Sequence, residues 1–584
     1  MPDSPQSPAQ LMQQANAFHV EGRLDEAIAL YRLIIEQEPG ASGAWYNLGL
    51  ALRRRDRLTE AIEALRRALS CSQERPEFHL ELGKTLLQNN QAHEAVLAFQ
   101  AAATLNPDLL EAYYFLGLIA RTQGEYATAL THLAMIPENS GKLYASARLE
   151  AAKAHFATQD FPAARAILSS LKEALPDNLE VFFYLGVISL EIGALPDALT
   201  ALEQAVVLAP DNPHAHCELG NACYQAGRLE DAARSYENAI QAALPDPAAR
   251  NFAMSTCCYN LGMALRNTGR LREAVKRYDE SIRYAPADFG PRRLRIESAS
   301  ACNLRCRHCP TGLDYNATNR TVMTPELFDT LIQQMRGIRN IIDCVLYLGG
   351  EPLLNRNLAQ MCRRVKEETS VTTTSFNTNA MLVTEEICRQ LQGARVNRIQ
   401  ISVDGRSPDE NDQIRQGSCY ATVAKNIRLL KESLPTTQIC IANTVIKRRD
   451  DPDVPEAPEF LRHDFPDLPI DTTYAMRWPG LSDRTMLGRH MQTSKLPAKG
   501  YCNKPFTEMV VRANGDITLC CYDILGEHVM GNIMRDNLLD VWKSSAYQEL
   551  RAAILENQPE SLPAVCRNCA IYSGEYLLTD NSLA

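Results

Sequence analysis

The sequence predicts a multidomain protein: an all-α solenoid, then an α/β partial barrel, then a small α+β domain. Three observations predict this order. Small residues recur every 34 residues through the first half, which indicates stacked helical pairs. From residue 292, apolar strand-like runs alternate with helical segments. Beyond residue 500 a short hairpin pattern lies between cysteines, and 584 residues are in any case too many for one core.

The first half repeats a pair of antiparallel helices. Gly49, Gly83 and Gly117 are 34 residues apart, and each is followed by an alanine twelve residues later and a bulky residue four further on. A small residue where two helices cross lets them pack closely. The segment Trp45-Tyr46-Asn47-Leu48-Gly49 resembles the first-helix signature of the tetratricopeptide repeat (TPR) family. The resemblance implies about eight repeats over residues 8–288.

Such arrays present an extended concave surface for binding. The TPR resemblance implies a bound peptide or protein segment, and the alternative is a scaffold for self-association or for docking to a larger assembly. Residues 1–290 contain 25 Lys and Arg against 35 Asp and Glu, so the whole net charge of −10 lies in this half. This excess indicates either a basic partner or an acidic surface that aids solubility. The negative charge argues against general nucleic-acid binding.

The composition also bears on the cellular compartment. No apolar run approaches the ~20 residues that span a bilayer, and the first ten residues lack the basic-then-apolar order of a secretory signal. We therefore expect a cytoplasmic protein with no membrane partner. In a reducing compartment, the eighteen cysteines are expected to bind metal or do chemistry rather than form disulfides.

Residues 292–480 are expected to form six βα units. Strands are predicted at 294–300, 343–348, 372–378, 398–403, 438–446 and 470–476, and helices at 325–335, 357–368, 385–392, 420–433 and 455–464. Right-handed crossovers place the helices outside a parallel sheet, which gives a partial, TIM-like (βα)6 barrel. Functional residues then belong at the C-terminal ends of the strands.

The segment Cys302-Asn303-Leu304-Arg305-Cys306-Arg307-His308-Cys309-Pro310 follows the first predicted strand. Three cysteines in one loop can hold three irons of a [4Fe-4S] cluster and leave the fourth iron open to a ligand. The motif resembles the radical S-adenosylmethionine (SAM) superfamily, in which that iron binds the amino and carboxylate groups of SAM. A structural zinc site and a ferredoxin-type cluster are the alternatives, although their usual cysteine spacings differ.

The resemblance extends to the ends of later strands. Gly349-Gly350-Glu351-Pro352 resembles the superfamily's GGEP motif, whose backbone groups bind the amino group of SAM, and glycine lets the main chain approach a ligand closely. The resemblance implies further cofactor contacts from His308, Asn379, Ser402, Asp404 and Arg415. Arginine suits paired hydrogen bonds to a carboxylate. The alternative for each residue is a role in shaping its loop or, for His308, in shielding the cluster.

A second cysteine set follows an expected linker at residues 481–500. A hairpin over 508–520 and a helix over 538–555 are expected to bring Cys502 and Cys520 near the CxxC of Cys566 and Cys569. This pattern resembles the SPASM domain, here 501–575 with a tail at 576–584, and implies one auxiliary [4Fe-4S] cluster with these four ligands. Zinc is the alternative metal. The preference for Cys520 over the adjacent Cys521 rests on family spacing alone.

Together, these resemblances imply a radical SAM oxidoreductase or maturase. It would reductively cleave SAM to a 5′-deoxyadenosyl radical and abstract a hydrogen atom from a peptide or protein captured by the array. Flavodoxin or ferredoxin would supply the electron. The alternative substrate is a small molecule such as a sugar or aminocyclitol, with the array docking a partner protein. A non-catalytic adaptor is disfavoured, because the expected cluster ligands and the GGEP turn are intact.

Overall fold

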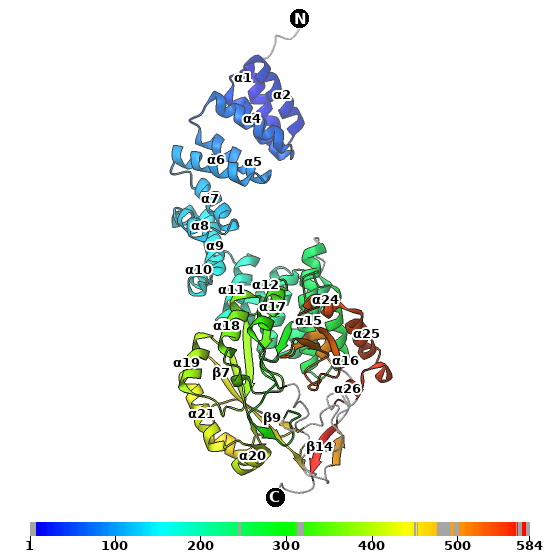
Figure 1. Cartoon of the computed structure of the whole chain (residues 1–584). Helices are drawn as coiled ribbons and strands as arrows, with labels where there is room; N and C mark the ends of the chain where they lie inside the picture. The colour runs from blue at the N-terminus through cyan, green and yellow to red at the C-terminus, as the bar shows by residue number, and fades with distance from the viewer. Residues whose placement is uncertain are drawn as a thin grey trace. The chain divides into compact units, whose positions relative to one another are not determined.

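The computed structural model describes residues 7–242, 247–311, 320–448, 451–452, 454–475, 492–495, 502–567, 569 and 575–579. The chain divides into two compact units, Met1–Gly227 and Arg228–Ala584 (Figure 1). Each unit is described by itself. Among the described residues, no helix is long and apolar enough to cross a membrane.

The first unit is a stack of helical pairs. Its helices are α1 (Pro8–Val20), α2 (Leu24–Gln37), α3 (Ser42–Arg54), α4 (Leu58–Cys71), α5 (Pro76–Gln88), α6 (Ala92–Leu105), α7 (Leu110–Thr122), α8 (Tyr126–Ala134), α9 (Lys142–Ala157), α10 (Phe161–Ala174), α11 (Leu179–Glu191), α12 (Leu195–Leu208) and α13 (Pro213–Gln225). A Cβ atom on Gly49 would lie 2.6 Å from the Leu65 side chain, and one on Gly83 would lie 2.6 Å from Phe99. The predicted pairing of small and bulky residues is therefore confirmed.

The second unit begins with three more helices of the repeat type, α14 (Leu229–Gln241), α15 (Pro247–Asn267) and α16 (Leu271–Arg283). Gly262 on α15 meets Tyr278 on α16, where an added Cβ would lie 2.8 Å from the ring. The Arg292 guanidinium, at the start of the next domain, lies 5.0 Å from the ring centroid of Tyr259 on α15. This contact joins the last repeat to the barrel domain.

The barrel domain has the six predicted parallel strands, in the order β1 (Arg293–Ile296), β3 (Asp343–Val345), β4 (Thr373–Thr378), β5 (Arg398–Asp404), β7 (Gln438–Val445) and β9 (Ile470–Tyr474). Its helices are α17 (Pro325–Arg336), α18 (Leu358–Glu368), α19 (Glu385–Gly393), α20 (Pro408–Ile414), α21 (Tyr420–Ser433) and α22 (Glu459–Asp464). Strand side chains such as Leu294, Phe376 and Ile399 are buried with Leu331 of α17 in one core. The end of the last predicted strand, at Met476, lies outside the described residues.

The C-terminal hairpin extends this sheet, which the sequence did not predict. Strand β11 (Glu508–Val511) pairs in parallel with β1, and β12 (Asp516–Thr518) and β13 (Val529–Asn532) continue from β11 in antiparallel fashion. The described residues thus form a nine-stranded sheet. Every residue of β11 is buried, so both faces of this strand are covered, and its two edges pair with β1 and β12.

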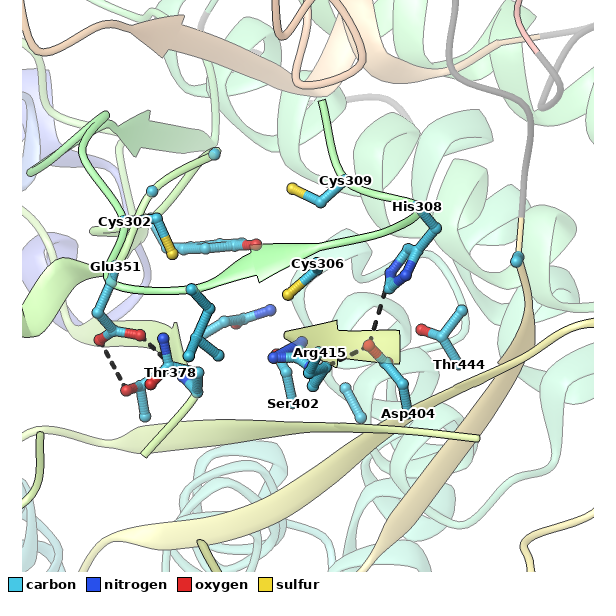
Figure 2. Close-up of a pocket in the computed structure, with 18 of the residues that line it drawn as sticks. Cys302, Cys306, His308, Cys309, Glu351, Thr378, Ser402, Asp404, Arg415 and Thr444 are labelled. Carbon is cyan, nitrogen blue, oxygen red and sulfur yellow. Dashed lines mark hydrogen bonds and ion pairs between the residues drawn. The ribbon is translucent and has the colours of Figure 1, made fainter. Parts of the chain in front are cut away.

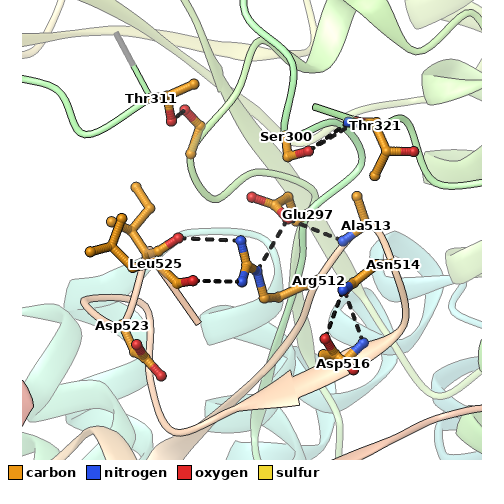
Figure 3. Close-up of polar contacts among 12 residues, drawn as sticks. Glu297, Ser300, Thr311, Thr321, Arg512, Ala513, Asn514, Asp516, Asp523 and Leu525 are labelled. Carbon is orange, nitrogen blue, oxygen red and sulfur yellow. Dashed lines mark hydrogen bonds and ion pairs between the residues drawn. The ribbon is translucent and has the colours of Figure 1, made fainter. Parts of the chain in front are cut away.

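A buried ion pair fixes this hairpin to the barrel domain (Figure 3). The Glu297 carboxylate, just after β1, accepts a hydrogen bond from the Ala513 backbone at 3.1 Å and lies 3.6 Å from Nε of Arg512. Arg512 also donates to the carbonyls of Ile524 and Leu525, at 3.3 and 3.1 Å. The pair therefore holds both the hairpin turn and the loop that follows β12.

Two expectations for the C-terminal region need correction. The helix predicted at 538–555 is two helices, α24 (Leu538–Lys543) and α25 (Ser545–Leu555), because Ser544 has an extended backbone and its hydroxyl caps α25. Strand β10 (Gln492–Lys495), within the predicted linker, pairs with β14 (Glu575–Thr579), which also pairs with β8 (Lys447–Arg448). Paired strands therefore replace part of the expected linker and tail.

Candidate active site

A cavity of about 240 Å³ opens at the C-terminal ends of the barrel strands. Figure 2 shows that the side chains of Cys302, Cys306 and Cys309 all point into it. It is also lined by Gly349, Gly350, Glu351, His308, Asn379, Ser402, Asp404 and Arg415. Pro352 is the one predicted cofactor contact outside this lining, because it begins the short 3-10 helix η3 (Pro352–Leu354).

A short ladder fixes the cysteine loop. Strand β2 (Arg305–Cys306) pairs in antiparallel fashion with β6 (Arg415–Gln416), and the Arg307 amide donates to the Ile414 carbonyl at 2.9 Å. Cys306 is buried, which raises the pKa of its thiol to about 12. A thiolate at this place therefore needs a cation beside it, as a metal centre provides.

Glu351 holds two loops together rather than facing the cavity with free oxygens. Its carboxylate accepts from the Thr378 hydroxyl at 2.7 Å and from the backbone amides of Asn379 and Leu353 at 2.8 and 3.1 Å. Burial raises the pKa of this carboxyl, and the three donors oppose that rise. The Asn379 side chain in turn donates to Asn303 of the cysteine loop at 2.8 Å. The GGEP turn, the β4 end and the cysteine loop are thus one connected structure.

The two glycines of the GGEP turn are needed for close packing of the backbone. A Cβ atom on Gly350 would lie 2.3 Å from the Ala299 carbonyl oxygen and 2.4 Å from that of Ala301. One on Gly349 would lie 2.9 Å from the Ile524 side chain of the C-terminal domain. Approach to a ligand was the predicted reason for these glycines. The structure adds a second reason, which is contact of Gly350 with the segment between β1 and the cysteine loop and of Gly349 with the C-terminal domain.

Arg415 and Asp404 form an ion pair inside the cavity. Nε of Arg415 donates to Oδ2 of Asp404 at 2.7 Å, and His308 Nε2 lies 3.6 Å from the same oxygen, which is too far for a hydrogen bond (Figure 2). Burial lowers the pKa of His308, so the imidazole is neutral at pH 7. Asp404 was predicted to contact the cofactor directly. In the structure Asp404 lines the cavity, and its Oδ2 also accepts the hydrogen bond that orients Arg415.

Other lining residues were missed by the sequence analysis. Tyr347, two residues before the GGEP turn, lines the cavity, as do Thr444 and Thr473 near the C-terminal ends of β7 and β9. Their positions at predicted strand ends were the available signal. A strand end alone does not show which of its residues face the cavity.

Four cysteines of the C-terminal domain line a second, apolar cavity. They are Cys502, Cys520, Cys566 and Cys569, with Tyr522 and Leu562 among the other residues. Burial raises the pKa of Cys502 to about 12 and also raises those of Cys520 and Cys566. These are the four thiols that the sequence selected.

Cys521 lies outside that lining and makes a different contact. It lies near the buried carboxylate of Glu508, and burial together with that carboxylate raises the pKa of its thiol. Oε2 of Glu508 lies 3.1 Å from Nζ of Lys504 and 3.9 Å from Arg295. Burial acts to raise the pKa of Glu508, but the two cations outweigh it and lower the pKa to about 2. Arg295 also donates to the Tyr347 carbonyl at 3.5 Å. This charged group therefore contacts the barrel cavity through the backbone of Tyr347.

Comparison with known families agrees with this arrangement. A model of the radical SAM superfamily matches residues 296–461, and a model of the SPASM iron-sulfur cluster-binding domain matches residues 502–570. Tetratricopeptide repeat models match residues 9–76, 80–143, 149–213, 190–248 and 255–288. The chain therefore carries a TPR array, a radical SAM domain and a SPASM domain in that order. Its domains imply a [4Fe-4S] cluster, SAM and an auxiliary iron-sulfur cluster.

The chain is similar to GTP 3′,8-cyclases. It is 28% identical to that of Alkaliphilus metalliredigens (strain QYMF) over 136 residues, 23% of this chain and 42% of the cyclase. It is 25% identical to that of Aquifex aeolicus (strain VF5) over 172 residues, 29% of this chain and 52% of the cyclase. The chain spans about half the length of the curated relatives it matches. A crystal structure of BtrN with AdoMet and 2-DOIA is 19% identical and covers 48% of this chain and 92% of BtrN, with a TM-score of 0.34.

The residues present fit the implied cofactors. Three thiols from one loop line the barrel cavity, which suits a cluster with one open iron. Four thiols line the second cavity, which suits a cluster with all its irons ligated. In both cavities burial disfavours the thiolate form of the cysteines unless a cation lies beside them. A bound metal centre would supply that positive charge and stabilise the thiolates.

Proposed function

We propose that this enzyme removes a hydrogen atom from one residue of a peptide or protein that the TPR array captures. The observation that carries the proposal is the convergence of three thiols, the GGEP turn and the Arg415–Asp404 pair on one cavity at the strand ends. In this proposal Cys302, Cys306 and Cys309 ligate the SAM cluster. Cys502, Cys520, Cys566 and Cys569 ligate the auxiliary cluster.

The reduced cluster and SAM together supply a 5′-deoxyadenosyl radical when both are bound. The protein's part is to position SAM. The Gly349–Glu351 backbone lies beside the cysteine loop, where it can accept hydrogen bonds from an ammonium group. Arg415, held by Asp404, offers its terminal nitrogens to a carboxylate. Ser402 and His308 border the remaining space, where the ribose and adenine are expected to lie.

The substrate is expected to enter beside the C-terminal ends of β7 and β9. Thr444 and Thr473 on these strands line the cavity and can donate hydrogen bonds to backbone carbonyls of an extended chain. The array would raise the local concentration of a weakly bound chain at this entrance. A small one-electron donor such as flavodoxin or ferredoxin would reduce the SAM cluster. Cys502, Cys520, Cys566 and Cys569 would hold the auxiliary cluster, which would supply a site for one-electron transfer. We place the reaction in the cytoplasm, where the reducing environment keeps cysteine ligands available.

A small-molecule substrate is the alternative, and one observation favours it. The described C-terminal residues gather four cysteines in one cavity and leave Cys521 outside its lining, so they offer ligands for a single auxiliary cluster. An auxiliary domain with one cluster resembles that of radical SAM enzymes that act on small molecules. A sugar or aminocyclitol could then be oxidised at the SAM cavity while the array docks a partner protein.

The test is deuterium transfer from a labelled substrate into 5′-deoxyadenosine, with enzyme reconstituted anaerobically. Labelled peptides and labelled sugars are offered in parallel, and transfer from the sugars alone would overturn the peptide proposal. Cys306→Ala is expected to abolish SAM cleavage, because the cluster loses one of its three ligands. Cys566→Ala is expected to retain uncoupled SAM cleavage and lose product formation. Cys71→Ala, at an exposed cysteine of the array, is the matched control and should keep both activities.

A further inference from the structure

The first helices of successive repeats line one side of the array. Helix α3 contacts α5, α7 contacts α9, α9 contacts α11, and α11 contacts α13. In a curved stack the helices that approach one another form the inner, concave wall, which is the binding surface of such arrays. Two residues before the small residue of the third to seventh repeats, this wall alternates between acids and aromatic rings. The five residues in order are Glu81, Phe115, Glu150, Tyr184 and Glu218.

In the third repeat the acid is neutralised from within the array. Lys84, one turn after Glu81, lies 3.1 Å from its carboxylate and 5.6 Å from the ring centroid of Phe115 in the next repeat. Arg53, from the preceding repeat, lies 2.7 Å from the same carboxylate. Lys84 also bonds Glu111. The carboxylate of Glu81 is thus paired with two cations.

The fifth repeat reproduces this arrangement. Lys153 lies 2.8 Å from Glu150 and 5.9 Å from the ring centroid of Tyr184, and Arg121 of the preceding repeat lies 2.5 Å from Glu150. Lys153 also bonds Glu180 at 2.8 Å. The arrangement is therefore a recurring feature of the inner wall: an acid, a lysine one turn later, an arginine from the repeat before and a ring from the repeat after.

The seventh repeat keeps the acid and lacks both cations. Asn221 stands where the lysine stands in the third and fifth repeats, and Leu190 stands where the arginine stands. Within the described part of the first unit, the Glu218 carboxylate accepts a hydrogen bond from Asn221 at 3.0 Å and has no lysine or arginine partner. Burial, with Glu191 nearby, raises the pKa of Glu218, while Asn221 and His214 oppose the rise. Burial makes the charged form of Glu218 unfavourable, and a cation beside it would offset that cost. In the third and fifth repeats the internal lysine and arginine already do so.

We propose that Glu218 receives a lysine or arginine side chain of the bound chain, in the place that Lys84 and Lys153 fill in the third and fifth repeats. The net charge of the unit supports a basic partner independently. Residues 1–227 contain 16 Lys and Arg against 27 Asp and Glu, a formal net charge of −11. The proposal rests on the proposed function, because it assumes that the array captures a peptide, and it adds that the captured segment is basic at this point.

The experiment uses the full chain, immobilised under anaerobic conditions, and a library of twelve-residue peptides. One central position of each peptide is lysine, arginine, norleucine or glutamate. Each of the other positions is an equal mixture of amino acids. Captured peptides are counted by mass spectrometry. The wild-type chain should prefer lysine or arginine over norleucine by about tenfold, the value of one charge-assisted hydrogen bond, and added salt should reduce the preference.

Three variants separate this role from a general effect of charge. Glu218→Gln should abolish the preference, whereas Glu173→Gln, an exposed acid on the second helix α10, should keep it. Asn221→Lys restores the internal cation, so it should lower capture of basic peptides and raise the melting temperature of the array. Capture without basic preference, or a preference that survives Glu218→Gln, overturns this inference alone. Failure to capture any peptide overturns the proposed peptide function as well.

Discussion

Replacing Gly350 by alanine tests whether the GGEP turn must lie directly against the cysteine loop. The new Cβ would lie 2.3 and 2.4 Å from the carbonyl oxygens of Ala299 and Ala301 and 2.8 Å from the Ser300 carbonyl carbon. A carbon and an oxygen in contact lie about 3.3–3.6 Å apart, so the turn must move by about 1 Å. All three neighbours are backbone atoms, so no side-chain rotation can relieve the clash.

We expect Gly350→Ala to cost about 3 kcal/mol. Overpacking contributes about 1–3 kcal/mol, and the Glu351 amide loses part of its 2.8 Å hydrogen bond to the Ala301 carbonyl. For a domain of this size the melting temperature should fall by roughly 6–12 °C. The assay is anaerobic calorimetry of the unit that contains the barrel, together with SAM binding by equilibrium dialysis, which should weaken.

Gly393→Ala is the matched control. Gly393 ends α19 in the same domain, and an added Cβ there meets nothing within 4 Å. This change should be neutral or stabilise the domain by up to about 1 kcal/mol. If Gly350→Ala melts at the temperature of this control and binds SAM normally, the described contact between the turn and the cysteine loop is wrong.

Three further predictions follow from single sites. Arg395 has a φ of +50° just after α19 and is exposed, so Arg395→Gly should relieve strain and raise the melting temperature by about 2–4 °C; a lower melting temperature would contradict this. Glu508→Gln should destabilise the fold by about 3 kcal/mol at pH 7, because the pKa of about 2 lies far below the usual value of 4.5, and this contribution is lost as the pH falls from 4.5 towards 2. In a protein that already carries Lys504→Met, Glu508→Gln should cost less free energy of unfolding than it does in the wild type. If the costs of the two substitutions simply add, Glu508 and Lys504 are not energetically coupled. Cys520→Ala should remove the iron of the auxiliary cluster while Cys521→Ala keeps it, and the reverse iron contents would show that Cys521 is the ligand.

The fold was predicted well where its signals are local. Strands and helices of the barrel follow from apolar runs and from caps such as Thr324 before α17, and the repeats follow from small residues at fixed spacing. The attachment of β11 to β1 could not be predicted, because residues such as Arg295 and Val510 pair across more than two hundred positions of sequence. The break at Ser544 was missed because the helical pattern continues on both sides of it.

The site divides in the same way. The cysteine spacing lies within one loop, so the sequence alone predicts that Cys302, Cys306 and Cys309 converge. The Arg415–Asp404 pair and the three donors to Glu351 depend on how separate strand ends meet, and family resemblance did not suggest them. The Glu218 site could not be predicted, because the sequence shows only a glutamate in a helix. Its lack of a lysine or arginine partner within the described part of the first unit is a feature of the folded array, where the third and fifth repeats pair the equivalent glutamates.

The most direct test of the account is the electron paramagnetic resonance spectrum of the reduced, anaerobically reconstituted enzyme before and after addition of SAM. The measurement is clearest on a double variant with Cys502→Ala and Cys566→Ala. This variant should lack the auxiliary cluster, so the signal of the barrel cluster is seen alone. The account predicts a [4Fe-4S] signal that changes when SAM binds at the open iron. A protein that binds zinc and no iron, or an iron signal that SAM leaves unchanged, would contradict it.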